Sequence, residues 1–424
     1  MDYNEAVRLI ADYIRRGETK RENFRIGMEV EHFLIHDENF RSVSYYGENG
    51  VEETMRKLHE NGFEEHGEET HVLSLLRGDA QFTTEPGGQL ELSIAPQKTL
   101  GDLEKIYDDT MHEVMEIIRP HGQSVAAMGY HPVTKIDEIK LLPKARYDHM
   151  YRYFFTSGRY AHNMMKGTAS LQASVDYVDE ADWAKKMRLL SVLSPVFYAI
   201  FDNAPIFEGE IYAKHALRQS IWEETDRART GLIPDAFDPD FGYEAYARWL
   251  LEIPPIFMEK NGVLVDETRP FREVITEEMG DEEIFHMLSI VFPDIRAKTY
   301  LEVRMPDSLP QPYGMSATAL IYGLMKNAAA VDTLSARYAK VRFADAQKAK
   351  ASVEENGVRG LLMGEEILGV AKEIRAAAAE ALGEEAHYLD PLDEILTSGK
   401  TLKDRFTEKL AHGLGEAMEM EFIR

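Results

Sequence analysis

Two glutamates at alternate positions give the first sign of chemistry in this sequence. Residues 24–35 read FRIGMEVEHFLI, and as a strand they would place Glu29 and Glu31 on one face and apolar side chains on the other. Two carboxylates about 7 Å apart along a strand repel each other unless water or a cation screens them. A hard divalent cation with oxygen ligands is the usual solution, whereas a solvated sheet face is the alternative for this segment taken alone.

A second segment repeats the pattern after a tight turn. Residues 81–96 read QFTTEPGGQLELSIAP, and Pro86 and Gly87 occupy the central positions of an expected type II turn. In the strand that follows, Glu91 shares one face with polar neighbours, and leucine and isoleucine form the other. Glu85 in the turn and Glu91 in the strand are therefore expected to bring two more carboxylates to the polar face.

Two further segments alternate between polar and apolar residues. Residues 170–176 would present Gln172 among small polar side chains on one strand face. Residues 292–307 alternate more clearly, and as one continuous strand they would place these side chains on a single face: Arg296, Lys298, Tyr300, Glu302 and Arg304. Cations interleaved with a carboxylate suit a site that binds both a metal ion and a phosphate.

The elements that would position these side chains are strands separated by helices of varied length. Helical patterns cover residues 99–119 and 181–201, and the second is apolar enough to supply core. Strands with one polar and one apolar face predict an α+β fold, in which an antiparallel sheet of about six strands has helices packed behind it and an open catalytic face in front. Residues 259–283 carry no hydrophobic period and are expected to form a loop or an excursion.

The C-terminal part of the chain differs in composition from the rest. From residue 316 onward the sequence is rich in Ala, Glu, Leu and Lys, and its patterns predict helices and no strand. We therefore predict a catalytic domain over residues 1–315 and a C-terminal helical region over residues 316–424 that packs on it.

Composition limits the classes of function. The net charge of −26 over 424 residues argues against nucleic-acid or membrane-surface partners, both of which need basic patches. The absence of cysteine excludes disulfides, thiolate metal sites and cysteine nucleophiles. No apolar run approaches the length of a membrane span, and residues 1–17 read as an amphipathic helix, so the sequence predicts a protein that stays in the cytoplasm.

The polar face as a whole suggests phosphoryl transfer. Its carboxylates can coexist only around two or three divalent cations, Mg²⁺ or Mn²⁺. They are Glu29, Glu31, Glu85, Glu91 and Glu302. Basic side chains nearby, Arg296 and Arg304, imply a polyanion such as a nucleoside triphosphate. Because the chain has no glycine-rich phosphate loop, metals and arginines would have to hold the phosphates.

The same segments resemble the plant and proteobacterial type of glutamate–cysteine ligase, whose fold is like that of glutamine synthetase. The resemblance rests on IGMEVEHF, TTEPGGQLELSIAP, the region from Arg146 to LQASVDY and EADW, R.SIW..TD..R.G from Arg218, and FPDIRAKTYLEVRMPD, which together span about residues 25–305. It implies that the five glutamates bind metal, and that Arg304 contacts the γ-phosphate of ATP with Arg296 nearby. It also implies that Arg229 grips the substrate α-carboxylate, with Arg218, Arg146 and Gln172 as further substrate-binding residues. Ser174 departs from the family, which usually has Asn there.

The implied reaction is ATP-dependent formation of a γ-glutamyl amide. Glutamate would be activated as γ-glutamyl phosphate, and an amine, cysteine in the family, would attack its carbonyl carbon. Three alternatives stay open: a ligase with another amine acceptor, a metal-dependent hydrolase that uses no ATP, and a catalytically inactive binding protein. His131 at the end of an apolar segment is either a further ligand or a structural loop histidine.

Overall fold

The computed structural model of the chain describes residues 1–66, 70–260 and 262–423. Its central feature in these residues is a sheet of nine strands in which every neighbouring pair is antiparallel, in the order β14-β15-β7-β1-β5-β4-β3-β2, with β6 paired to β1. The sheet begins at one edge with β14 (Ile295–Ala297) and β15 (Leu301–Val303). The prediction of a large antiparallel sheet is confirmed. The predicted number of about six strands is too low, because β2 (Glu64–Glu65), β3 (Ser74–Arg77) and β4 (Ala80–Thr84) form short strands that gave no clear sequence period.

The long strand β1 (Ile26–His36) lies at the centre of the sheet between β5 (Leu90–Gln97) and β7 (Leu171–Val175). The alternation expected for these strands is present. In β5 the leucines and Ile94 are buried, whereas Glu91 and Ser93 are only partly buried. The sheet therefore has one apolar face and one polar face, as its side-chain period requires. Strand β6 (Gln123–Ala126) pairs with the far end of β1.

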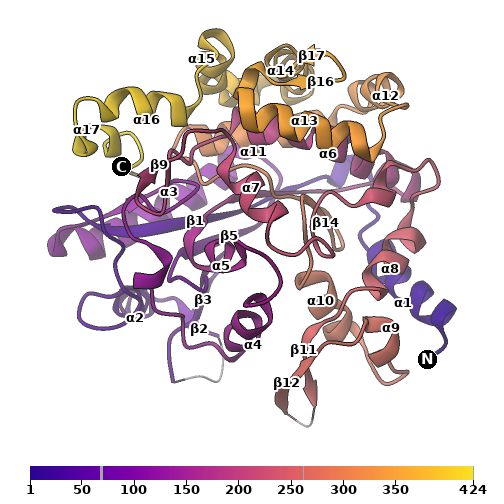
Figure 1. Cartoon of the computed structure of the whole chain (residues 1–424), viewed down its shortest axis with the longest axis horizontal. Helices are drawn as coiled ribbons and strands as arrows, with labels where there is room; N and C mark the ends of the chain where they lie inside the picture. Colours follow the sequence, from indigo (N-terminus) through magenta and orange to yellow (C-terminus); the bar gives the residue numbers. More distant parts are fainter. Residues whose placement is uncertain (67–69, 261, 424) are drawn as a thin grey trace.

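Helices cover the apolar face of the sheet. The helices α3 (Leu100–Ile118), α6 (Glu180–Ile200) and α11 (Tyr313–Lys326) contact strands of the sheet directly. Behind them lie α12 (Ala328–Arg337), α13 (Phe343–Asn356) and α14 (Ile367–Leu382), and Figure 1 shows α11, α13 and α14 together on one side of the sheet. The chain continues through α15 (Asp390–Ser398), α16 (Leu402–Leu410) and α17 (Leu414–Met418).

The predicted boundary between residues 315 and 316 falls inside α11. This helix is buried along nearly its whole length and packs on β7 and β1 as well as on α14. It therefore belongs to the core of the sheet and also begins the helical region, and one hydrophobic cluster continues from Ala6 to Leu402 and Ile423. The helical region also contains a short hairpin of β16 (Leu361–Leu362) and β17 (Glu365–Glu366), where the sequence predicted no strand.

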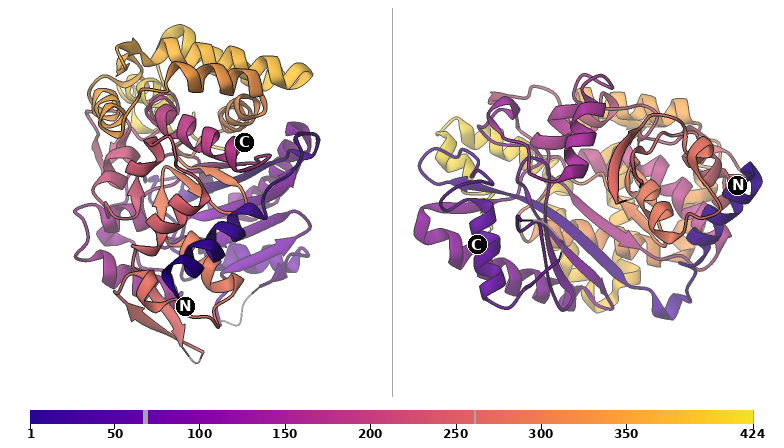
Figure 2. Two further views of the ribbon diagram at one scale, coloured as in Figure 1. Left: turned by 90° about the vertical axis from the view of Figure 1, so that its right-hand side faces the viewer. Right: turned by 90° about the horizontal axis from the view of Figure 1, so that it is seen from below.

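The opposite, polar side of the sheet carries a second set of elements. It includes α4 (Ala145–Phe154), α5 (Ala161–Gly167), α7 (Leu217–Glu223) and the excursion that follows α8 (Tyr243–Leu251). The sequence predicted a loop or an excursion over residues 259–283, and the structure has an excursion that contains β11 (Ile256–Lys260), β12 (Val263–Glu267), α9 (Phe271–Val274) and α10 (Asp281–Ser289). Figures 1 and 2 show the β11–β12 hairpin projecting on the side of the molecule away from α13 and α14.

The chain ahead of the sheet forms α1 (Tyr3–Arg15), which packs on α8, and α2 (Val51–Glu60) packs on α3. Among the described residues, no helix combines the length and the apolar character that crossing a membrane requires.

Candidate active site

A cavity of about 290 Å³ lies against the polar face of the sheet, and four of the predicted carboxylates line it. The register of strand pairing explains why these carboxylates lie close together. Glu31 of β1 lies directly opposite Glu91 of β5, and Glu29 lies opposite Gln172 of β7. Directly opposed side chains on one face have Cβ atoms about 5 Å apart, so pairing these strands brings their carboxylates together.

The fourth carboxylate, Glu85, is placed by the turn between β4 and β5. The amide of Gly88 donates to the carbonyl of Glu85 at 2.8 Å, and Gly88 has a φ of +85°. The left-handed residue is thus Gly88 and not Gly87, so the turn is a three-residue hairpin loop and not the predicted type II turn. Gly87 is needed for a different reason, since a Cβ there would lie 2.3 Å from the carbonyl oxygen of Lys166.

Electrostatic repulsion among these carboxylates is visible in their pKa values. Burial, together with the neighbouring carboxylates Glu302 and Glu91, raises the pKa of Glu29 to about 7. Burial and then Glu85 raise the pKa of Glu31 to about 8, and the same two causes raise the pKa of Glu91 to about 7. Near neutral pH these groups either keep protons or need cations beside them.

Cationic side chains face the carboxylates from the hairpin of β14 (Ile295–Ala297) and β15 (Leu301–Val303). Arg296 lies on β14, Lys298 in the connecting turn and Arg304 directly after β15. The predicted single strand is therefore two strands joined by a turn at residues 298–300. The side chains still converge because Arg296 lies opposite Glu302 in the antiparallel pair. Arg296, Lys298 and Arg304 all line the cavity.

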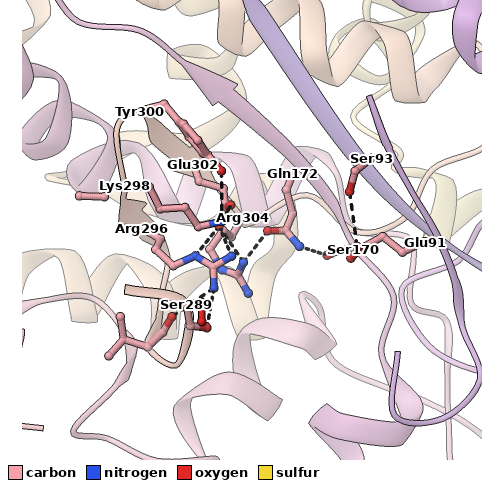
Figure 3. A network of polar contacts seen from close by, with 12 residues as sticks. Glu91, Ser93, Ser170, Gln172, Ser289, Arg296, Lys298, Tyr300, Glu302 and Arg304 are labelled. Atoms are coloured by element: carbon pink, nitrogen blue, oxygen red, sulfur yellow. Dashed lines mark hydrogen bonds and ion pairs between the residues drawn. The ribbon is translucent and has the colours of Figure 1, made fainter. Parts of the chain in front are cut away.

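Glu302 itself does not line the cavity and is fully buried. Its carboxylate accepts from Arg296 at 2.6 Å, Arg304 at 2.9 Å and Lys298 at 3.0 Å. Burial opposes its ionisation, but these three cations hold its pKa well below the usual range. In this structure its oxygens bind cations of the chain (Figure 3), and the metal-ligating role of Glu302 stays a prediction.

The fit of the cavity to divalent cations rests on donor chemistry. Four carboxylates without an ion pair among the described residues provide hard oxygen ligands, which suit Mg²⁺ or Mn²⁺. As the side chains stand, no three acidic or histidine groups of residues 1–66, 70–260 and 262–423 converge closely enough to hold an ion. The ligand types therefore fit, and binding would draw the carboxylates together.

Two of the predicted substrate-binding arginines lie outside the cavity. Arg229 is fully buried, and its guanidinium donates to Asp226, to the hydroxyl of Tyr153 and to the carbonyls of Pro254 and Ile290. Arg218 is 2% exposed and donates to the side chain of Asp307 and to backbone carbonyls of residues 304–306. Both arginines therefore bind acceptors of the chain in this structure and do not line the cavity, and their substrate-binding roles stay predictions.

The third arginine, Arg146, does line the cavity. Its Nε is buried without a hydrogen-bond partner, and the part of the chain that the structure describes offers its guanidinium no ion pair. Gln172 also lines the cavity, where it contacts Arg304 and Glu31.

Sequence reasoning assigned no role to several lining residues. Lys144 and Lys298 carry charge, and one wall is apolar, made of Met150, Met164, Met165, Trp222, Phe285 and Phe292. Methionines and aromatics at helical spacing look like core in a sequence, whereas Lys298 was placed on the alternating cationic face without a role of its own. His131 is a structural residue, because it is buried and packs between the hydroxyl of Ser42 and the carbonyl of Lys166, and burial lowers its pKa to about 3.

Known proteins resemble this chain over most of its length. The family model described as Glutamate-cysteine ligase family 2(GCS2) matches residues 25–421. Glutamate–cysteine ligase of Brassica juncea, a chloroplastic protein, is 28% identical over 97% of this chain and 82% of its own length. The chloroplastic glutamate–cysteine ligase of Arabidopsis thaliana is also 28% identical, over 97% and 81%. These chloroplastic relatives contradict the prediction of a cytoplasmic location.

Two solved structures share the fold. The glutamate–cysteine ligase of Francisella tularensis, solved with AMP, aligns with a TM-score of 0.53 at 10% identity over 94% of this chain and 87% of its own. The bifunctional glutathione synthetase of Pasteurella multocida aligns with a TM-score of 0.54 at 13% identity over 95% of this chain and 52% of its own.

Proposed function

The chain belongs to glutamate–cysteine ligase family 2, and we propose that it is an ATP-dependent ligase that joins the γ-carboxylate of glutamate to the amine of cysteine. The observation that carries the proposal is the pairing of two oppositely charged walls in one cavity. Carboxylates of β1, β5 and the β4–β5 turn face cations of β14 and β15. A nucleoside triphosphate with its divalent cations has the charge distribution that fits between them.

The proposed reaction has two steps. A γ-carboxylate oxygen of glutamate attacks the γ-phosphorus of ATP, and ADP leaves as γ-glutamyl phosphate forms. The amine nitrogen of cysteine then attacks the carbonyl carbon of that anhydride, phosphate leaves, and the nitrogen loses one proton. Activation is needed because a carboxylate is not an electrophile at neutral pH, so the enzyme mainly positions the reactants and neutralises charge.

The basic wall would bind the phosphates of ATP. Arg304 and Arg296 present guanidinium groups to the cavity, and Lys298 adds an ammonium group. Glu302 forms ion pairs with all three cationic side chains. These side chains are therefore oriented before substrate arrives, and the carboxylate offsets the repulsion between them. Negative charge on the transferring phosphoryl group is greatest in the transition state. Preorganised cations therefore stabilise the transition state more than the bound substrate.

The acidic wall would hold the divalent cations, two or three Mg²⁺ or Mn²⁺ ions. Its ligands would be Glu29, Glu31, Glu85 and Glu91. When bound, the cations would neutralise phosphate charge and polarise the phosphoryl oxygens. The pKa values of Glu29, Glu31 and Glu91, raised by burial and then by neighbouring carboxylates, support this role, since a nearby cation would offset both causes.

We assign the α-carboxylate of glutamate to Arg146. Arg146 lines the cavity from α4, and its guanidinium makes no hydrogen bond or ion pair to the described chain, whereas Arg229 donates from all three guanidinium nitrogens and Arg218 from two of them. A bidentate carboxylate would pair with the Arg146 guanidinium. The apolar wall that includes Met150 and Met164 would then contact the side chain of the amine substrate.

The experiment uses the full chain with ATP, Mg²⁺ and glutamate, and follows ADP release. We expect slow release with glutamate alone, much faster release with cysteine, and a γ-glutamylcysteine product identified by mass. Faster release with another amine at equal concentration would identify a different acceptor. ADP release that does not require glutamate would contradict the proposal, and a Glu91→Gln variant serves as the inactive control.

A further inference from the structure

The acidic and basic walls of the cavity are joined through one side chain. Among the described residues, no direct hydrogen bond or ion pair links the cations of β14 and β15 to the four lining carboxylates. Gln172 contacts both groups, since its Oε1 accepts from Arg304 and its Nε2 donates to Oε1 of Glu31 at 3.5 Å. Figure 3 shows Gln172 between Arg304 and Ser170.

The chemistry of the partners fixes the orientation of the Gln172 amide. A guanidinium can only donate, so the amide oxygen must face Arg304. The amide nitrogen then faces Glu31 and the hydroxyl of Ser170, to which it donates at 3.3 Å. Ser170 in turn donates to Glu31 from its backbone amide at 2.7 Å and from its hydroxyl at 3.1 Å. The amide oxygen therefore contacts the basic wall, and the amide nitrogen contacts the acidic wall.

The backbone of Gln172 is held rigidly. Strand β7 lies between β1 and β15 in the sheet, and Gln172 pairs with Glu29 of β1. The side chain is 4% exposed, so it has little room to leave its partners. A side chain on a central strand is positioned more precisely than one on a loop.

We propose that Gln172 is a positioning residue, which fixes the Arg304 guanidinium relative to Glu31 and thereby aligns the phosphate-binding and cation-binding halves of the site. This inference rests on the proposed function and replaces the expectation that Gln172 binds substrate. The amide oxygen limits where the guanidinium of Arg304 can lie, and the amide nitrogen ties that position to the carboxylate of Glu31. Misalignment of the two halves would slow transfer of the phosphoryl group without weakening the binding of glutamate.

The first test compares Gln172→Met with the wild-type chain. Methionine has a similar length but neither donates nor accepts strongly, so both links are lost. We expect kcat to fall about 10–100-fold, the effect typical of a residue that orients a ligand, while KM for glutamate changes less than about 2-fold. A raised KM for glutamate at unchanged kcat would overturn the inference, since Gln172 would then bind substrate.

Gln172→Glu tests the direction of the amide. It keeps the length and an acceptor for Arg304 but turns an oxygen toward Glu31, so kcat should fall here too. Wild-type kcat in this variant would overturn the inference even if Gln172→Met failed to fold. Gln81→Met is the matched control, because Gln81 lies on β4 of the same sheet, contacts Ser74 at 3.1 Å and does not line the cavity.

A double variant separates positioning from any other role. Arg304→Ala alone should lower kcat about 10²–10³-fold. If Gln172 acts through Arg304, adding Gln172→Met to Arg304→Ala should cause little further loss, whereas additive losses would overturn the inference. These outcomes presuppose an active wild-type chain. A wild-type chain without ATP-dependent ligase activity would instead contradict the proposed function.

Discussion

Two clusters of buried charge in this molecule differ in what neutralises them. In the cavity, Glu29, Glu31 and Glu91 have raised pKa values, and no ion pair reaches them in the part of the chain that the structure describes. In a second cluster beside β6, every residue makes at least one hydrogen bond to the chain, although Oδ1 of Asn203, Nε of Arg218 and Oε1 of Glu421 have no partner. It consists of Asp202, Asn203, Arg218, Asp307 and Glu421.

The difference shows how a binding site can be told from a structural network. The guanidinium of Arg218 donates to backbone carbonyls of residues 304–306 and to Asp307, so it holds the segment that follows β15. All three guanidinium nitrogens of Arg229 also donate to the chain, whereas the guanidinium of Arg146 at the cavity makes no hydrogen bond or ion pair to the described residues. A charge that the chain leaves without a partner is available to a ligand, and a charge that the chain satisfies supports the fold.

The largest expected effect is on the structural side of this comparison. Arg229→Ala should lower the free energy of unfolding by about 3–5 kcal/mol, because it leaves Asp226 and two carbonyls without their buried partner. Thermal or denaturant unfolding measures this. Arg227→Ala is the control, since the Arg227 side chain is 87% exposed. Unchanged stability with a raised KM for glutamate would restore Arg229 to the site.

The next largest effect is on the cavity side. Glu91→Ala should lower kcat/KM by about 10²–10³-fold while leaving the chain folded, because the substitution removes a charge that its neighbours repel. Melting temperature should stay the same or rise, as measured without divalent cations. Glu65→Ala on β2, at the exposed edge of the sheet, is the matched control. Near-normal activity at low Mg²⁺ would show that Glu91 is not needed for cations.

A smaller effect should distinguish the remaining arginine. Arg146→Ala should raise KM for glutamate about 10-fold with little change in kcat, since a carboxylate that does not react is bound similarly in the ground and transition states. Steady-state kinetics with glutamate varied at saturating ATP measures this. Arg159→Ala, in the exposed loop after the same helix, is the control. An unchanged KM would leave the α-carboxylate without an assigned partner.

The last expected effect is a pH dependence of stability, and it concerns the second cluster. Burial raises the pKa of Glu421 to about 8, so the folded state holds a proton that the unfolded state releases above pH 4.5. Stability therefore falls as pH rises from about 5 to 8, with this group contributing at most on the order of 1 kcal/mol per pH unit. Glu421→Gln should make the decline shallower in denaturant unfolding across that range. An identical slope would show that Glu421 ionises freely in the folded chain.

Local alternation was enough to find much of the sheet and three of the lining glutamates. Glu29, Glu31 and Glu91 lie on strands long enough to show a period of two, and the polar face follows from it. The two-strand hairpin at residues 295–303 was read as one strand, because three-residue strands are too short to show where the chain turns. The likeness to glutamine synthetase stays a prediction.

The choice among arginines could not be made from sequence. Arg218, Arg229 and Arg304 are chemically identical, and what separates them is which acceptors the folded chain brings within reach. The acceptors of Arg229 come from residues 153, 226, 254 and 290, which only the tertiary structure brings together. One sequence signal did separate them, since Arg304 lies in an alternating segment and the other two do not.

The three cations held by Glu302 also have a consequence for how substrate arrives. The chain carries a net charge of −26, so its long-range field repels a polyphosphate, and attraction begins only close to the recessed group of Arg296, Lys298 and Arg304. At an ionic strength of about 0.1 M the screening length is about 10 Å, which weakens the distant repulsion more than the short-range attraction. Adding moderate salt should therefore speed nucleotide association, the reverse of the usual behaviour when a cationic site binds a polyanion.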